Sequence, residues 1–249
     1  MPHKPPGVTP PAQPPVEQLV VDQRVYGRRL GRPLRAVRQS AVDAWLPKIG
    51  IAVPAVPAAL DPLALFSSPV REAWLEVGFG GGEHLLAQAA ANPQAGLIGC
   101  EPFINGMAAL LRAIDDEPAR AGNIRVLMDD ARPLIASFRD ASLAKAFILF
   151  PDPWPKARHH KRRFVAKANL DQLARVLKDG AELRLATDDP GYLRWMLIEM
   201  ADHPAFAWTA RRPAEWRQRP ADSPKTRYED KGLAGAAPAF LTWRRVPRA

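Results

Sequence analysis

Short apolar runs alternate with helical patterns from residue 73 onward, and no other feature of this chain limits its fold as much. Five apolar runs have the length of strands, and segments with helical periodicity separate them. The runs span 73–77, 95–100, 124–128, 144–150 and 181–187, and the helical segments 82–91, 103–114, 131–138, 161–177 and 191–201. This alternation predicts an α/β fold in which a mostly parallel sheet carries helices on both faces. Two further runs, 205–210 and 239–245, bring the expected number of strands to seven.

The chain divides into three parts on this interpretation. Residues 1–23 are rich in proline, and we expect them to form a disordered tail. Residues 24–69 form a basic N-terminal arm and an irregular connection, with a short helix at 41–49. Residues 70–249 form the α/β domain. Ligands of such sheets bind beyond the carboxyl ends of the strands, so functional residues should follow the strands directly.

Several classes of protein are excluded by simple counts. No stretch approaches the ~18 consecutive apolar residues of a membrane-spanning helix. The first residues lack the apolar core of a signal peptide. A single cysteine, Cys100, forms neither an internal disulfide nor a cysteine-rich zinc site. We therefore expect a soluble cytoplasmic protein without a bound metal.

The positive charge is concentrated outside the middle of the chain. The net charge of +9 divides into +4 over residues 1–69, −3 over 70–150 and +8 over 151–249. Three basic clusters, 24–38, 156–167 and 211–219, contain the aromatic residues Tyr26, Phe164 and Trp216. Each cluster alone fits a solvated surface, but three with interleaved aromatic residues favour a nucleic-acid partner. Arginine, which provides most of these cations, contacts phosphates in a bidentate manner and stacks on bases.

A glycine-rich loop follows the first expected strand. Glu76 precedes it by two residues, and Gly78 and Gly80 permit a close backbone approach to a ligand. The spacing differs from the dinucleotide fingerprint because Glu83 occupies the third glycine position. An acid before the loop repels a pyrophosphate but suits the cationic groups of S-adenosylmethionine. A purely structural turn remains an alternative.

Acids also follow the second and third strands. Glu101 is placed to accept hydrogen bonds from ribose hydroxyls, and with the glycine loop it favours a nucleoside cofactor over a helix-start role. After the third strand, either Asp129 or Asp130 is placed to bind an adenine amino group. The other aspartate is then a helix N-cap.

The loop after the fourth strand is the most specific stretch of the chain. Pro151, Pro153 and Pro155 restrict the backbone and present Asp152, Trp154 and Lys156 at the same sheet edge, just before the basic run. Trp154 either walls a pocket or packs in the core. Two later segments belong to this edge on the same reasoning: Asp188 and Asp189, of which one is expected to be a cap, and the polar stretch Thr226, Arg227, Tyr228 and Glu229.

These motifs together resemble the TrmB-type tRNA (guanine-N7-)-methyltransferases. The residues that carry the resemblance are EVGFGGGEHL (76–85), IGCEP (98–102), FPDPWPKARHHKRR (150–163), ATDD (186–189) and TRYE (226–229). The resemblance covers residues 24–245 and leaves out the proline-rich tail. It implies a class I, Rossmann-like methyltransferase fold. It also implies the transfer of a methyl group from S-adenosylmethionine to guanine N7 at position 46 in the variable loop of tRNA, with S-adenosylhomocysteine as product.

The resemblance assigns roles to residues of this chain. It implies cofactor contacts at Glu76, Gly78, Gly80, Glu101, Asp130 and Asp152, where Asp130 is chosen because it directly precedes Ala131. It implies that Asp152 is the catalytic residue. It implies tRNA contacts at Lys156, Asp188, Thr226, Arg227, Tyr228 and Glu229. Beyond these roles we expect Arg162 and Arg163 to bind phosphates, so that their neutralisation flattens the salt dependence of tRNA binding.

Two other functions remain open at this point. One is a different RNA methyltransferase that acts on an exocyclic base amine, although Asp152 interrupts the proline pair that such enzymes often carry. The other is a non-catalytic RNA-binding module on the same scaffold, against which the retained acids Glu76, Glu101 and Asp152 argue. The methylated nucleoside and a calorimetric test of cofactor binding discriminate between these functions. The sequence leaves a monomer and a homodimer equally open.

Overall fold

The structure is a computed structural model, and it describes residues 27, 29–54, 59–230 and 237–248, without the side chains of Tyr228 and Asp230. The predicted proline-rich tail and the first residues of the basic arm lie outside this range. Among the described residues, no helix is long and apolar enough to cross a membrane.

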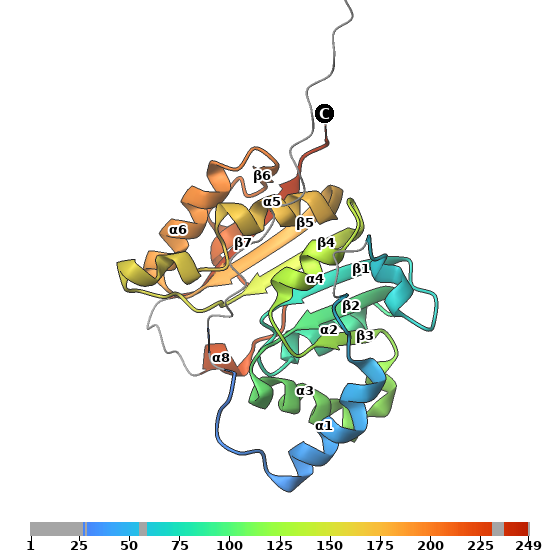
Figure 1. Cartoon of the computed structure of the whole chain (residues 1–249). Coiled ribbons are helices and arrows are strands. Elements are labelled where there is room, and N and C mark those ends of the chain that lie inside the picture. The colour runs from blue at the N-terminus through green and yellow to red at the C-terminus, as the bar shows by residue number, and fades with distance from the viewer. Residues whose placement is uncertain (1–26, 28, 55–58, 231–236, 249) are drawn as a thin grey trace, which may run out of the picture.

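A seven-stranded sheet forms the centre of the molecule (Figure 1). Its strands lie in the order β3-β2-β1-β4-β5-β7-β6, and all neighbours are parallel except the pairs that include β7. The expected mostly parallel α/β fold is therefore confirmed. The strands are β1 (Glu72–Val77), β2 (Ala95–Cys100), β3 (Ile124–Leu127), β4 (Leu143–Leu149), β5 (Leu177–Thr187), β6 (Phe206–Trp208) and β7 (Ala239–Arg245).

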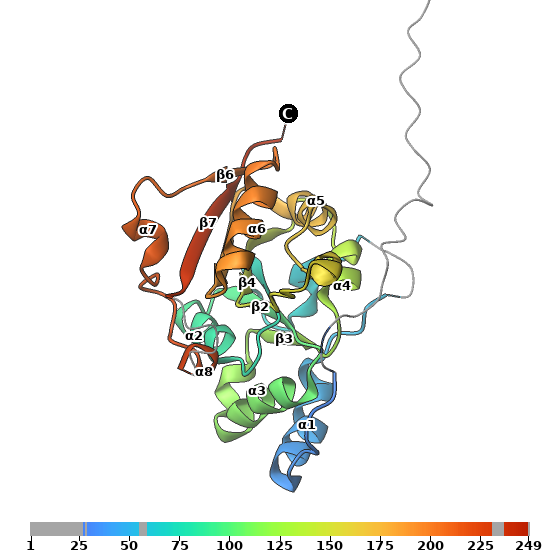
Figure 2. The same cartoon turned by 90° about the vertical axis from the view of Figure 1, so that its left-hand side faces the viewer.

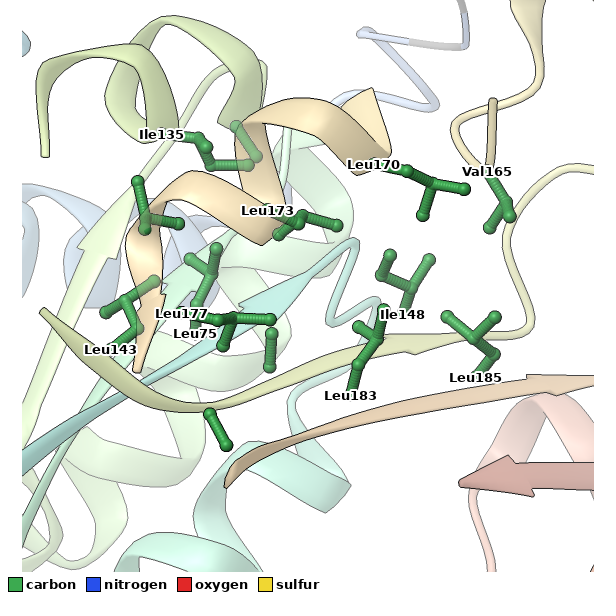
Figure 3. Close-up of a cluster of buried hydrophobic side chains, with 14 of the residues drawn as sticks. Leu75, Ile135, Leu143, Ile148, Val165, Leu170, Leu173, Leu177, Leu183 and Leu185 are labelled. Atoms are coloured by element: carbon green, nitrogen blue, oxygen red, sulfur yellow. The ribbon is translucent and has the colours of Figure 1, made fainter. Parts of the chain in front are cut away.

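Helices cover both faces of this sheet (Figure 2). One apolar cluster packs α4, α5 and α6 against one face, and a second packs α1, α2 and α3 against the other. Figure 3 shows the first cluster, in which Leu170 and Leu173 of α5 pack with Ile148 and Leu183 of the sheet. The helices are α1 (Ala36–Ile49), α2 (Glu83–Ala91), α3 (Ile104–Asp116), α4 (Ala131–Ser137), α5 (Lys167–Val176), α6 (Pro190–Ala201), α7 (Ala214–Arg217) and α8 (Arg227–Asp230), with 3-10 turns η2 (Pro62–Leu65), η3 (Pro118–Ala121) and η4 (Ala157–Arg162).

Three predicted boundaries were wrong. Helix α1 begins at Ala36, five residues before the start expected at residue 41. The helix expected at 161–177 is confined to α5, because residues 157–162 form the separate turn η4. Strand β5 follows α5 directly at Leu177, four residues before the strand expected at 181–187, so Asp179 and Gly180 lie inside it. Gly180 has a φ of 76°, and the register with β4 shifts nearby, so the glycine accommodates an irregularity within a strand.

The strand order fixes where a ligand can bind. From β1, the chain first adds β2 and β3 on one side and then returns to add β4 and β5 on the other. The helices therefore leave the carboxyl ends of β1 and β4 in opposite directions, and a crevice forms between them. Ligands of open α/β sheets bind at such a switch point.

Candidate active site

A pocket of about 390 Å³ is formed by the residues that follow β1. The glycine loop, the first turns of α3 and the segment at the start of α8 all contribute to its walls, although they are far apart in the sequence. Its lining also includes Phe150, at the end of β4. The volume lies within the range of ~300–1,000 Å³ typical of small-molecule sites. Five predicted site residues line it: Glu76, Gly78, Gly80, Thr226 and Arg227.

The glycine loop leaves open space above its backbone. Gly78 and Gly80 have φ values of 72° and 57°, and a Cβ atom built on either would meet no atom within 4 Å. Side chains here would occupy this space and strain the backbone. Gly106 of α3 explains the close packing behind the loop, because its Cβ position lies 2.5 Å from the carbonyl oxygen of Gly80. The loop therefore has the shape of a cradle that a ligand can approach.

Glu101 links this loop to the end of β2. Its two carboxylate oxygens accept hydrogen bonds from the backbone N–H groups of Phe103 and Gly80, each at 2.8 Å. Burial raises the pKa of Glu101, although both backbone hydrogen bonds oppose this shift. Each oxygen keeps a further lone pair. Glu101 thus orders the glycine loop and retains capacity for a hydroxyl donor.

The two aspartates after β3 differ in their surroundings. Asp130 is the N-cap of α4, accepts a hydrogen bond from the backbone of Arg132 at 2.8 Å, and also pairs with the Arg132 guanidinium. Asp129 forms an ion pair with Arg29 of the basic arm. Neither side chain lines the pocket. The adenine contact assigned to Asp130 remains a prediction, and Asp130 serves as a cap whether or not it binds adenine.

The loop with three prolines adopts an unusual backbone at two positions. Phe150 and Trp154 have φ values of 51° and 44°, which non-glycine residues rarely adopt. They flank Asp152, whose side chain reaches solvent at this edge of the sheet. The Cβ position of Gly27, in the basic arm, lies 3.7 Å from Oδ2 of Asp152. The protein atoms around this carboxylate exclude part of its hydration water, and this partial desolvation raises the pKa of Asp152 above its ordinary value.

The basic run after this loop divides into exposed and buried cations. Lys156, Arg158 and Lys161 are exposed. Arg163 is buried, with 5% of its surface accessible, and donates a hydrogen bond from Nε to the carbonyl of Pro153 at 2.8 Å. Its guanidinium also lies 5.0 Å from the ring centre of Tyr192 and 4.9 Å from that of Trp195. These contacts make Arg163 a support of the proline loop, so a phosphate contact is not expected from it.

Trp154 does not belong to the core. Its indole is partly exposed, and the Arg162 guanidinium lies 4.9 Å from its ring centre. His159 packs edge-on against the same indole, with ring centres 5.9 Å apart. Partial desolvation and the neighbouring cations lower the pKa of His159. Trp154 thus contacts two side chains of the basic run, Arg162 and His159.

Asp189, and not Asp188, is the aspartate that caps a helix at this strand end. Asp189 is the N-cap of α6, because its carboxylate accepts a hydrogen bond from the backbone of Tyr192 at 2.6 Å. Asp188 is buried, with 8% exposure, at the end of β5. The backbone N–H of Phe150 donates to the carbonyl of Ala186, so this strand end adjoins the proline loop. The tRNA contact expected at Asp188 remains a prediction.

The segment Thr226–Glu229 folds back on itself as a capping box. The backbone N–H and hydroxyl of Thr226 donate to Oε1 of Glu229 at 3.1 and 3.0 Å. Arg219 pairs with the same carboxylate. Burial opposes the shift, but these donors lower the pKa of Glu229. Arg227 reaches Oε1 of Glu83 at 3.1 Å, which closes the segment over the glycine loop.

Two contributions to the site were not predicted. His84, in the first turn of α2, lines the pocket and contacts Glu76. Asp222 fixes the segment before α8, because its side chain pairs with Arg184 at 2.6 Å and its carbonyl accepts from Gln88 at 2.6 Å. The position of His84, eight residues after Glu76 and at the start of a helix, could have indicated the first contact. Nothing in the sequence indicates the second.

The residues of this pocket fit S-adenosylmethionine. The open backbone at Gly78 and Gly80 offers room for a ligand, and the buried carboxylate of Glu76 in the lining suits a cationic amino acid. Glu101 does not line the pocket, but its carboxylate bonds the adjacent Gly80 N–H and suits a ribose. Among the described residues, no cluster of three His, Cys, Asp or Glu side chains could hold a metal ion.

Known proteins resemble this chain along most of its length. A family model described as "Putative methyltransferase" matches residues 71–241. A tRNA (guanine-N(7)-)-methyltransferase of Rhodospirillum rubrum is 51% identical over 94% of this chain and 92% of its own length. The protein of the same name from Paramagnetospirillum magneticum is 47% identical over 90% and 94%. A 16S rRNA (adenine(1408)-N(1))-methyltransferase with cosubstrate SAM from Catenulisporales acidiphilia has the same fold, with a TM-score of 0.53, 18% identity, and coverage of 80% of this chain and 99% of that one.

Proposed function

This chain belongs to the family of tRNA (guanine-N7-)-methyltransferases, and from that premise we propose that it methylates guanine 46 in the variable loop of tRNA. It is an enzyme, and S-adenosylmethionine is its cosubstrate. One observation carries the proposal for the site: the glycine cradle, Phe150 at the start of the Asp152 loop, and Thr226 line one pocket. This arrangement supports a cofactor site that opens directly onto the residues expected to bind a base. A tRNA substrate agrees with the cytoplasmic location expected from the sequence.

The cofactor site divides into an amino-acid end and a nucleoside end. Glu76 lines the pocket, is buried, and offers its carboxylate to the ammonium group. Gly78 and Gly80 leave the backbone accessible to the ligand. Glu101 supplies acceptors for ribose hydroxyls, and the Asp129–Asp130 pair lies at the end of the neighbouring strand for the adenine. Bound S-adenosylmethionine supplies an electrophilic methyl group, and S-adenosylhomocysteine is the product.

Guanine N7 requires little chemical activation from this protein. Its lone pair lies in the ring plane and carries no proton at neutral pH, so no general base is needed. The new carbon–nitrogen bond forms as the sulfur–carbon bond breaks, and the positive charge passes from sulfur to the purine. Asp152 orients the guanine through its N1–H and exocyclic amine, and its carboxylate stabilises the charge that develops on the ring.

The exposed cations and the C-terminal segment hold the tRNA. Lys156 follows the Asp152 loop directly and is exposed, so it can reach a phosphate. Asp188 lies beside the same loop at the end of β5. Within Thr226–Glu229, the capping box occupies Thr226 and Glu229, and Arg227 lines the pocket. The side chain of Tyr228 lies outside the described residues, and its tRNA contact remains a prediction.

Methylation of matched tRNA transcripts tests the proposed position. We expect methyl incorporation into a transcript with guanine at position 46 and none into a transcript with adenine there. Nucleoside mass spectrometry should identify 7-methylguanosine. Equal labelling of both transcripts would contradict the position, and a different methylated nucleoside would contradict the reaction. Asp152→Asn should lower the single-turnover rate at saturating tRNA and cofactor, and an unchanged rate would exclude the role of this carboxylate.

A further inference from the structure

We propose that His84 is a positioning residue of the cofactor site, which orients Glu76 so that one carboxylate oxygen faces the ammonium group of S-adenosylmethionine. Nδ1 of His84 lies 2.8 Å from Oε2 of Glu76, and each side chain is only 3% exposed. Among the described residues, no hydrogen bond reaches Oε1. Both residues line the pocket. The proposal deepens the cofactor site proposed above and rests on it.

Local structure holds the His84 ring in one orientation. Gly82, with a φ of 82°, ends the glycine loop, and α2 begins one residue later, so His84 faces back towards the end of β1. Its ring packs edge-on against Phe147, with ring centres 4.7 Å apart. Phe147 is fully buried on β4, opposite Glu76 in the sheet register. The ring is therefore confined between a rigid aromatic residue and the carboxylate that it contacts.

The hydrogen bonds of the pair define its charge. The carboxylate of Glu76 accepts, so Nδ1 of His84 carries a proton. Among the described residues, Nε2 has no hydrogen-bond partner. An imidazolium would leave a charged N–H group buried without an acceptor, which costs more than an unpaired lone pair. A neutral ring protonated at Nδ1 follows, and the pair keeps a net charge of −1, which is complementary to an ammonium group.

Two ligands distinguish a positioning role of His84 from a role in stability alone. S-adenosylhomocysteine contains the amino-acid group, whereas 5′-methylthioadenosine contains the same nucleoside without it. If His84 acts through Glu76 on the ammonium group, loss of the imidazole weakens binding of the first ligand alone. If His84 only supports the glycine loop, loss of the imidazole weakens both. The comparison needs no catalytic turnover.

Calorimetry on the full chain provides the test, with four variants: His84→Leu, His84→Asn, Glu76→Gln and the Leu/Gln double variant. We expect His84→Leu to weaken S-adenosylhomocysteine binding about tenfold, as for loss of one charge-assisted hydrogen bond. Binding of 5′-methylthioadenosine should change less than about twofold. His84→Asn, whose amide nitrogen can replace Nδ1, should restore most of the affinity. In the Glu76→Gln background, His84→Leu should have little further effect.

Three results would overturn the proposal. These are equal losses for both ligands, a full tenfold loss in the Glu76→Gln background, or a His84→Asn variant as weak as His84→Leu. If His84→Leu does not fold, nitrogen NMR of the unmodified protein decides, because we expect the Nδ1–H tautomer, and the Nε2–H tautomer would contradict the proposal. Failure of the unmodified protein to bind S-adenosylhomocysteine would instead refute the cofactor site, so the two failures are distinguishable.

Discussion

Replacing Arg163 by methionine separates structural from RNA-binding cations in the basic run. Methionine keeps the length and the apolar character of the arginine stem but removes the guanidinium. The Pro153 carbonyl then loses its donor, and the rings of Tyr192 and Trp195 lose their cation. The change therefore acts on the loop that carries Asp152, although it resembles the neutralisation of a surface charge in the sequence.

The contacts set the magnitude of the expected effect. A hydrogen bond from a charged donor contributes about 1.5–3 kcal/mol, and a cation–π contact about 0.5–2 kcal/mol, with the larger values at buried sites. Because these terms are not additive, we expect Arg163→Met to lower the free energy of unfolding by about 2–4 kcal/mol. Lys161 is the matched control, since it is exposed two residues earlier. Lys161→Met should change the free energy of unfolding by less than about 0.5 kcal/mol.

Urea unfolding and the salt dependence of tRNA binding measure the two effects separately. Each lost phosphate contact lowers the slope of log K against log salt concentration by about 0.7–0.9. Lys161→Met should show this decrease, whereas the slope of Arg163→Met should match that of the unmodified protein. An Arg163→Met protein with unchanged stability and a reduced slope would refute the assignment. It would then support the phosphate contact that the sequence pattern predicts for Arg163.

Three further outcomes are expected from the site. Gly106→Ala should lower the free energy of unfolding by about 1–3 kcal/mol and weaken binding of S-adenosylhomocysteine, because the new Cβ would lie 2.5 Å from the Gly80 carbonyl oxygen. The control is Gly122→Ala, which has space for a Cβ and a helical φ and should be neutral or slightly stabilising in the same assays. Because desolvation raises the pKa of Asp152, single-turnover rates should fall on acidification at a pH above the ~3.9 of an unperturbed aspartate, and the Asp152→Asn profile should lack this limb. The pKa of Glu229 is lowered in the folded protein, so the stabilisation by its carboxylate is complete above pH ~4.3 and is lost as the pH falls through the folded pKa. The difference in melting temperature between the unmodified protein and Glu229→Gln should therefore shrink on acidification. A constant difference would contradict the role of the carboxylate charge.

Most helices and strands of this fold could be predicted from the sequence, because each leaves a pattern of apolar residues within one short segment of the chain. Strand-length apolar runs and helical periodicity located all seven strands and the six longer helices. They failed at both ends of the segment 161–177, because η4 forms a separate turn before α5, and β5, with its irregularity near Gly180, begins directly after it. Backbone conformations at these positions depend on neighbours from other strands, and no short-range pattern reports them.

Within the site, the sequence determined which residues follow the strands. The rule that parallel strands present their carboxyl ends at one edge placed Glu76, Glu101, Asp152 and Asp188 near each other, and family resemblance assigned their expected chemistry. The sequence could not assign different roles to adjacent residues of the same type, such as Asp188 and Asp189. The choice depends on which carboxylate caps α6, and only the turn geometry fixes that.

Tertiary structure decided which charges are used for binding and which hold the fold. Arg162 and Arg163 are neighbours in a uniform basic run, yet Arg163 is buried because α6 brings Tyr192 and Trp195 against it. His84 gains its partner because α2 folds back onto the end of β1. Composition and motifs specify the side chains available at a sheet edge. Packing between distant segments specifies their exposure and partners, since burial depends on contacts that the chain makes only when folded.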